Sequence, residues 1–170
     1  MSAGTPQTTI VLRPANVDDI SFIMACERRP GYQPFVGQWT AEKHRAVLAD
    51  ASFRYFIGSD GTDLRGFAIL REDPLRAQNL YLKRIAVHDA DKGHGRTLMA
   101  ALNNWVFTHT DTHRFWLDVV EDNPRARHLY ESLGFVAEGI VREAYAKPDG
   151  TRGSFVQMSL LKPDWPARRL

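Results

Sequence analysis

The stretch of sequence that decides the fold is LYLKRIAVHDADKGHGRTLMAALNNWVF, residues 80–107. Its first part, residues 80–87, is rich in apolar and aromatic side chains and predicts a strand. From residue 93 to 107 the apolar side chains recur at helical spacing, which predicts a helix. Residues 115–120 return to a strand pattern. A strand, a crossover helix and a second strand place the two strands parallel in one sheet.

The segments on either side of this unit predict antiparallel strand pairs. Residues 53–57 and 64–70 are joined by SDGT at 59–62, which is typical of a hairpin turn. Residues 135–145 and 155–160 form a second pair across another turn. The sheet is therefore predicted to be mixed, mostly antiparallel and six to seven strands wide.

Further helices are predicted to flank this sheet. A strand at residues 10–12 leads into a helix that opens at Asp18, and a second helix covers residues 40–49. The helix after Asn123 has a capping side chain, a proline in its first turn and Gly134 at its end. Together these elements predict an α/β fold with about four helices.

The length of the chain, 170 residues, is that of one domain. We expect the domain to span residues 10–161, with a flexible N-terminus at 1–9 and a C-terminal tail at 162–170. Residues 1–9 lack the basic and apolar regions of a secretion signal, and no apolar run reaches the ~18 residues of a membrane span. The single Cys26 cannot form an internal disulfide, and a buried thiol is its simplest interpretation. A cytoplasmic protein without a membrane partner is expected.

The charge balance argues against nucleic acid as a partner. Lys and Arg number 22 and Asp and Glu 20, a formal net charge of +2, which gives no extended basic field for a phosphate backbone.

The sequence DADKGHGR at residues 89–96 predicts an anion site. Two glycines let backbone amides approach a ligand where a helix begins, and Lys92, Arg96 and His94 add positive charge. A plain structural turn is an equal alternative. The dinucleotide fingerprint fails because Leu98 stands where it needs glycine or alanine, and no P-loop sequence follows.

Two further side chains are candidates for chemistry. Asp118 interrupts the apolar strand 115–120, so its carboxylate is paired, at an edge or functional. Tyr130 lies on the inner face of the helix after Asn123, where a core tyrosine is the usual explanation.

The order of these signals resembles the GNAT superfamily of N-acetyltransferases, in particular the branch of ribosomal-protein-alanine and polyamine N-acetyltransferases. LKRIAV at residues 82–87, followed by the glycine turn, is similar to the acetyl-CoA segment. NPRARHLYESLGF at 123–135 is similar to its companion motif, and RPA at 13–15 to the family's opening. One departure is Ala90, where the family usually has Gln or Arg.

The resemblance implies acetyl-CoA as cosubstrate, a primary amine as acceptor and no metal. It implies that the parallel strands splay apart and that pantetheine adds along the open strand edge. The cofactor-binding residues that it implies are Ile85, Ala86, Val87, Lys92, Gly93, His94, Gly95, Arg96, Thr97, Asn123, Arg127 and Tyr130.

The resemblance also implies roles in catalysis. Asp118 matches a carboxylate that accepts the amine proton through water, and Tyr130 matches the acid that protonates the leaving thiolate. Tyr81 and Lys83 stand where some relatives carry a base. The candidate acceptor-binding residues are Tyr32, Phe35, Trp39, Tyr81, Lys83 and Tyr145.

Three functions stay open from the sequence. The first is direct transfer of an acetyl group to an amine, of a small molecule or of a protein. The second is a non-catalytic CoA-binding regulatory module with the same fold, and the third is a nucleotide-binding module. The acceptor is not specified, and the family implies that a homodimer can form.

Overall fold

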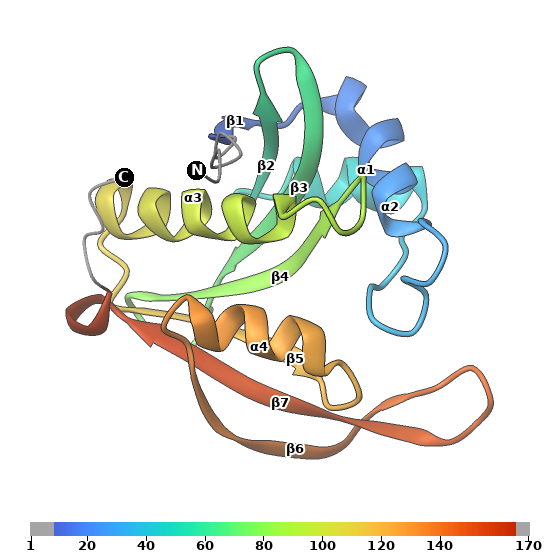
Figure 1. Cartoon of the computed structure of the whole chain (residues 1–170), viewed down its shortest axis with the longest axis vertical. Helices are drawn as coiled ribbons and strands as arrows, with labels where there is room; N and C mark the ends of the chain where they lie inside the picture. The colour runs from blue at the N-terminus through green and yellow to red at the C-terminus, as the bar shows by residue number, and fades with distance from the viewer. Residues whose placement is uncertain (1–8, 166–170) are drawn as a thin grey trace, which may run out of the picture.

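A computed structural model describes residues 9–165 of the chain (Figure 1). One seven-stranded sheet with the order β1-β2-β3-β4-β5-β7-β6 runs through the molecule. The strands are β1 (Val11–Pro14), β2 (Phe53–Asp60), β3 (Asp63–Glu72), β4 (Asn79–Val87), β5 (Arg114–Val120), β6 (Val136–Ala146) and β7 (Arg152–Leu161). The α-helices are α1 (Ile20–Glu27), α2 (Ala41–Leu48), α3 (His94–His109) and α4 (Pro124–Ser132). The predicted mixed sheet and its four flanking helices are confirmed.

The parallel pair of β4 and β5 divides the sheet into two antiparallel parts. The two strands pair only from Asn79 with Arg114 to Leu82 with Leu117. Every other pairing in the described sheet is antiparallel. Beyond Leu82 and Leu117 the strands separate, and Figure 1 shows β4 and β5 diverging. The predicted parallel pair and its splay are therefore both present.

A bulge in β4 lies at the point of separation. Leu70 of β3 pairs with Leu82, and Ile69 pairs with Arg84, so Lys83 is the extra residue on β4. Before the bulge Leu82 faces the core beneath α3, and after it Arg84 faces the opposite side, against Glu27 of α1. The bulge thus reverses which face of the sheet the side chains of β4 point to, at the place where the sheet opens.

The two faces of the sheet are covered by different helices. α3 and α4 cover one face, where Met99, Leu102 and Tyr130 join the core with Leu117 of β5, and Figure 1 shows both helices in front of the strands. The other face is packed by α1 and α2, whose side chains join the core with those of β2 and β3. Cys26 is fully buried in this second core, as expected of a structural thiol. No helix within residues 9–165 is long and apolar enough to cross a membrane.

The helix that begins after Asn123 is confirmed in detail. The Asn123 side chain accepts from the Ala126 amide at 3.1 Å, and Pro124 occupies the first turn, where its missing N–H costs no hydrogen bond. Gly134 after the helix has a φ of 98°, a left-handed conformation that glycine adopts without strain.

The two ends of the domain differ from expectation. Asp18 and Asp19 lie in a 3₁₀ turn (Val17–Asp19) that leads directly into α1. Asn16 caps this turn, and the buried Asp19 also pairs with Arg13 at 2.7 Å. At the other end, residues 162–164 form a 3₁₀ turn and Trp165 stacks on Phe107 with ring centroids 5.3 Å apart. The chain thus packs on the core beyond residue 161. The rest of the expected tail, 166–170, and residues 1–8 lie outside the described residues.

Candidate active site

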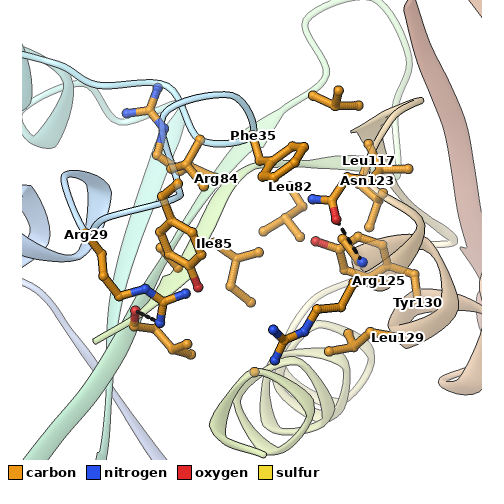
Figure 2. Close-up of a pocket in the computed structure, with 18 of the residues that line it drawn as sticks. Arg29, Phe35, Leu82, Arg84, Ile85, Leu117, Asn123, Arg125, Leu129 and Tyr130 are labelled. Atoms are coloured by element: carbon orange, nitrogen blue, oxygen red, sulfur yellow. Dashed lines mark hydrogen bonds between the residues drawn. The ribbon is translucent and has the colours of Figure 1, made fainter. Parts of the chain in front are cut away.

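A cavity of about 770 Å³ lies where β4 and β5 separate. Its walls come from the loop between α1 and α2, from β4, from β5, from the start of α3 and from α4. Figure 2 shows Arg29, Arg84 and Ile85 on one side of the cavity and Asn123, Arg125 and Tyr130 on the other. The structure brings many of the predicted site residues to this cavity: Tyr32, Phe35, Tyr81, Lys83, Ile85, Ala86, Val87, Gly93, His94, Gly95, Arg96, Asp118, Asn123 and Tyr130.

The start of α3 presents open backbone amides to the cavity. Gly93 precedes the helix with a φ of 75°, and its carbonyl accepts from the amides of Arg96 and Thr97 at 3.1 and 3.2 Å. No amide of residues 92–95 donates to any part of the described chain, as expected for the first turn of a helix. His94 is 8% exposed, and its Nδ1 also has no partner among these residues. The helix start therefore presents unpaired backbone donors that suit an anion.

The open edge of β4 carries a second row of donors and acceptors. The His88 amide donates to the Arg65 carbonyl at 2.8 Å, so His88, and Ala86 two residues before it, direct their backbone groups to β3. Because these groups alternate between the two edges of a strand, Ile85 and Val87 direct theirs to the open edge. The Val87 carbonyl accepts from Arg29 Nη1 at 3.2 Å on that side.

Tyr130 combines a buried ring with an open hydroxyl group. The residue is 9% exposed and packs on Phe135 with ring centroids 5.8 Å apart. Its hydroxyl makes no hydrogen bond within residues 9–165, although the residue lines the cavity. In Figure 2 the hydroxyl lies on the cavity side of the ring. Burial raises the pKa of the phenol, so it stays protonated across the neutral range.

Asp118 lies on the other face of the sheet from Tyr130. Its neighbours Leu117 and Val119 point into the core beneath α3 and α4, so the Asp118 side chain points away from it. The Tyr81 hydroxyl and Gln157 Nε2 lie 3.4 Å from its two oxygens. Burial raises the pKa of this carboxyl above its ordinary value, although both hydrogen bonds oppose the shift.

Five predicted residues do not line the cavity. Lys92 lies near Asp89 in the loop before α3, and the Thr97 hydroxyl donates to the His94 carbonyl at 3.1 Å. Arg127 pairs with Glu131 on the surface of α4. Trp39 lies under the Arg84 guanidinium, 4.2 Å from it, and Tyr145 stacks on Phe155.

The sequence interpretation missed a buried charge network beside the cavity. Glu27 is fully buried and accepts from Arg84 Nη1 at 2.6 Å and from the Trp39 amide at 3.2 Å. His44 Nε2 lies 3.2 Å from the same carboxylate, and His44 Nδ1 lies 3.2 Å from the Tyr55 hydroxyl. This network ties the loop between α1 and α2 to β4. A carboxylate seven residues after Ile20, on the apolar stripe of its helix, was the signal for it.

Arg125 and Arg29 were also missed, and both line the cavity. Arg125, in the first turn of α4, lies between the starts of α3 and α4 and pairs with Asp91 at 2.5 Å. Arg29 stacks on Tyr32, with its guanidinium carbon 3.6 Å from the ring centroid. The contact of Arg125 with Asp91 joins segments far apart in the sequence, and the stacking of Arg29 on Tyr32 depends on the irregular conformation of their loop, so neither was recognised.

A sheet opened between two parallel strands, over a glycine-rich helix start, is the architecture that the sequence resemblance predicted. The sequence model of the Acetyltransferase (GNAT) family matches residues 21–135, more than half of the chain. The chain therefore belongs to the GNAT family of acetyltransferases.

Three known proteins are similar to this chain. Spermidine N(1)-acetyltransferase of Vibrio cholerae serotype O1 is 41% identical over 61 residues, a stretch that spans 36% of this chain and 35% of that relative. A chimera of spermidine N-acetyltransferase SpeG from Vibrio cholerae and hSSAT superposes with a TM-score of 0.82 at 25% identity, covering 94% of this chain and 99% of the other. Vibrio cholerae spermidine N-acetyltransferase in complex with CoA and spermine has a TM-score of 0.81 at 24% identity, covering 93% and 98%. This last likeness is one of fold.

Proposed function

We propose that this protein is an acetyl-CoA-dependent N-acetyltransferase that acts on a primary amine. The observation that carries the proposal is the cavity at the splayed strands, which joins an open strand edge to an open helix start. The open strand edge supplies a row of backbone hydrogen bonds for an extended amide-containing arm. The open helix start supplies amides for a diphosphate. Both belong to one continuous cavity.

The cofactor is proposed to lie along β4 and across the start of α3. Ile85 and Val87 bind the pantetheine amides, and the open amides of residues 92–95 bind the diphosphate. Arg96 adds positive charge at this end, and Arg125, which also lines the cavity, is paired with Asp91. The bound thioester supplies the acetyl group that is transferred.

We propose that the acid and the base of the reaction are Tyr130 and Asp118, which lie on opposite faces of the sheet. Asp118 accepts a proton from the acceptor ammonium, either directly or through water, and burial raises the pKa of its carboxyl, which makes it a stronger base than an ordinary aspartate. Tyr130 donates its hydroxyl proton to the departing thiolate. No side chain needs to carry the acetyl group, and the thiol of Cys26 is fully buried.

The test separates turnover from binding alone. Acetyl-CoA is expected to raise the melting temperature, and thiol release is expected when amines are added. NAD or ATP in place of acetyl-CoA should give no stabilisation. Stabilisation by acetyl-CoA with no thiol release from any amine would favour the CoA-binding regulatory module and overturn the enzyme proposal.

A homodimer is proposed at the edge strand β6. Val136, Ile140 and Val141 are apolar side chains on this strand and are 61%, 55% and 42% exposed. An exposed apolar edge strand can add to a second copy of the chain. Light scattering should give twice the chain mass for the wild type and a monomer for Ile140→Lys. A wild-type monomer at micromolar concentration would contradict the dimer.

A further inference from the structure

The acceptor side of the cavity carries more positive than negative charge. The charged side chains that line it on the face of Asp118, and on the neighbouring loop, are Arg29, Lys83, Arg84 and Asp118 itself, and the neutral phenols are Tyr32 and Tyr81. The charge of Arg84 is balanced by Glu27 beneath it. Arg29 and Lys83 have no carboxylate oxygen within 4.0 Å anywhere in residues 9–165. Two cations thus face one carboxylate on this wall.

Lys83 is the cation nearest to the proposed base. It is the extra residue of the β4 bulge, its Nζ lies 5.9 Å from the Tyr81 ring, and the Tyr81 hydroxyl lies beside Asp118. Burial, followed by the nearby guanidinium groups of Arg84 and Arg71, lowers the pKa of Lys83, and the charge of Asp118 only partly opposes this. The Lys83 ammonium has no carboxylate within 4.0 Å in residues 9–165, so a bound anion would give it the partner that it lacks.

The other carboxylates of the cavity already have cationic partners. They are Asp89, Asp91 and Asp122, at the cofactor end and beside α4. Their partners are Arg65 and Lys92 for Asp89, Arg125 for Asp91 and Lys147 for Asp122. A polyamine keeps one or two further ammonium groups beside the one that reacts, and no unpaired carboxylate of this cavity is left to bind them.

Resting on the proposed acetyl transfer, we infer that the acceptor is a small amino carboxylate whose amine faces Asp118 and whose carboxylate binds Lys83. Aromatic side chains of Tyr32, Phe35 and Phe155 complete the cavity wall. Phe35 lines the cavity and is 39% exposed, so its apolar ring is accessible to a bound acceptor. An amino acid with an apolar side chain matches these three features, an amine site, an anion site and an apolar wall.

The first experiment compares acceptors that differ only in the carboxylate. Phenylalanine is assayed against 2-phenylethylamine, leucine against 3-methylbutylamine, and spermidine is assayed beside them, each by thiol release from acetyl-CoA. We expect kcat/KM to be about 10-fold or more higher for each amino acid than for its decarboxylated partner, the size of one charge-assisted contact. Amines or spermidine acetylated better than the amino acids would overturn the inference but leave the proposed function standing. No thiol release from any acceptor would instead contradict the proposed function.

The second experiment places the carboxylate contact on Lys83. Lys83→Gln should raise KM for the amino acid about 10-fold more than it raises KM for the decarboxylated amine, whereas Lys83→Arg keeps the charge and should keep the discrimination between the two acceptors. Lys162→Gln, which removes the same charge from an exposed position outside the cavity, is the matched control. An equal loss of kcat on both acceptors in Lys83→Gln and Lys83→Arg would make Lys83 a base rather than an anion site and would overturn the assignment.

Discussion

Tyr130 is placed by its helix so that only the hydroxyl group meets the cavity. The ring packs in the core against Phe135, and burial raises the pKa of the phenol. A protonated phenol beside the β4 edge can act as an acid without being a binding group. The ring of Tyr130 therefore serves packing and its hydroxyl group serves the proposed proton donation, so removal of one oxygen atom tests the second role alone.

Tyr130→Phe keeps the ring and removes only the hydroxyl. We expect kcat to fall by about 10²-fold or more, the usual contribution of a general acid, while the Kd of acetyl-CoA changes less than about twofold. Steady-state kinetics and calorimetry measure the two quantities. A large loss of acetyl-CoA affinity with unchanged kcat would make Tyr130 a binding residue instead.

The raised pKa of Asp118 predicts how kcat changes on the acidic limb of the pH profile. Burial raises the pKa of its carboxyl, so the unprotonated base is lost earlier as pH falls than for an ordinary aspartate. The kcat of the wild type should decline on this limb, and Asp118→Asn should lower kcat and flatten the decline. A pH–rate profile of both proteins checks this. The same acidic limb in the variant would assign the base to another group.

The backbone conformation of Gly93 predicts that a side chain at the start of α3 weakens acetyl-CoA binding. Its φ of 75° disfavours any β-branched residue, although a Cβ there would meet no atom within 4 Å. Gly93→Val should therefore distort the open amides and weaken acetyl-CoA binding about 10-fold or more. Gly61→Val, at an open position with a φ of 56° outside the cavity, is the matched control. Wild-type affinity of Gly93→Val in calorimetry would contradict the proposed diphosphate site.

At the scale of elements, the network around Glu27 connects α1, α2, β4 and the loop that walls the cavity. Glu27→Gln would leave Arg84 buried without its counter-charge, which costs about 3–5 kcal/mol in comparable pairs. The free energy of unfolding in urea should fall by this order. Glu42→Gln, which breaks an exposed contact with Arg45 on the neighbouring helix, should cause no measurable change. Equal stability of the two variants would show that the pair contributes little.

Most elements could be predicted because their signals are local. The hairpin turn at residues 59–62, the cap at Asn123 and the apolar spacing of α3 each lie within a few neighbouring residues. The start of the first helix also has a local signal, the cap by Asn16, whose side chain accepts from the Asp18 amide at 2.8 Å, but this signal was missed. The packing of Trp165 on Phe107 joins residues 58 positions apart, and no local pattern reports it.

At the scale of the whole molecule, the site could be predicted only in part. Residues 85–96 and 118–130 were found because they lie in motifs, and the structure brings both segments to one cavity. Arg29, Arg84 and Arg125 reach that cavity from elements that meet only after folding. Trp39 was expected at the acceptor site as an aromatic residue in the right loop, but it lies under Arg84.

The opening between β4 and β5 also predicts the kinetic mechanism of the proposed reaction, namely whether both substrates are bound at the same time. The cofactor is proposed to lie along β4 and the acceptor to enter from the α1–α2 side, so both can be present together. Initial rates at varied concentrations of both substrates should then give intersecting double-reciprocal lines. Desulfo-CoA, which cannot carry an acetyl group, should compete with acetyl-CoA and not with the amine. Parallel lines would require an acetylated enzyme and a nucleophile that the buried Cys26 does not provide.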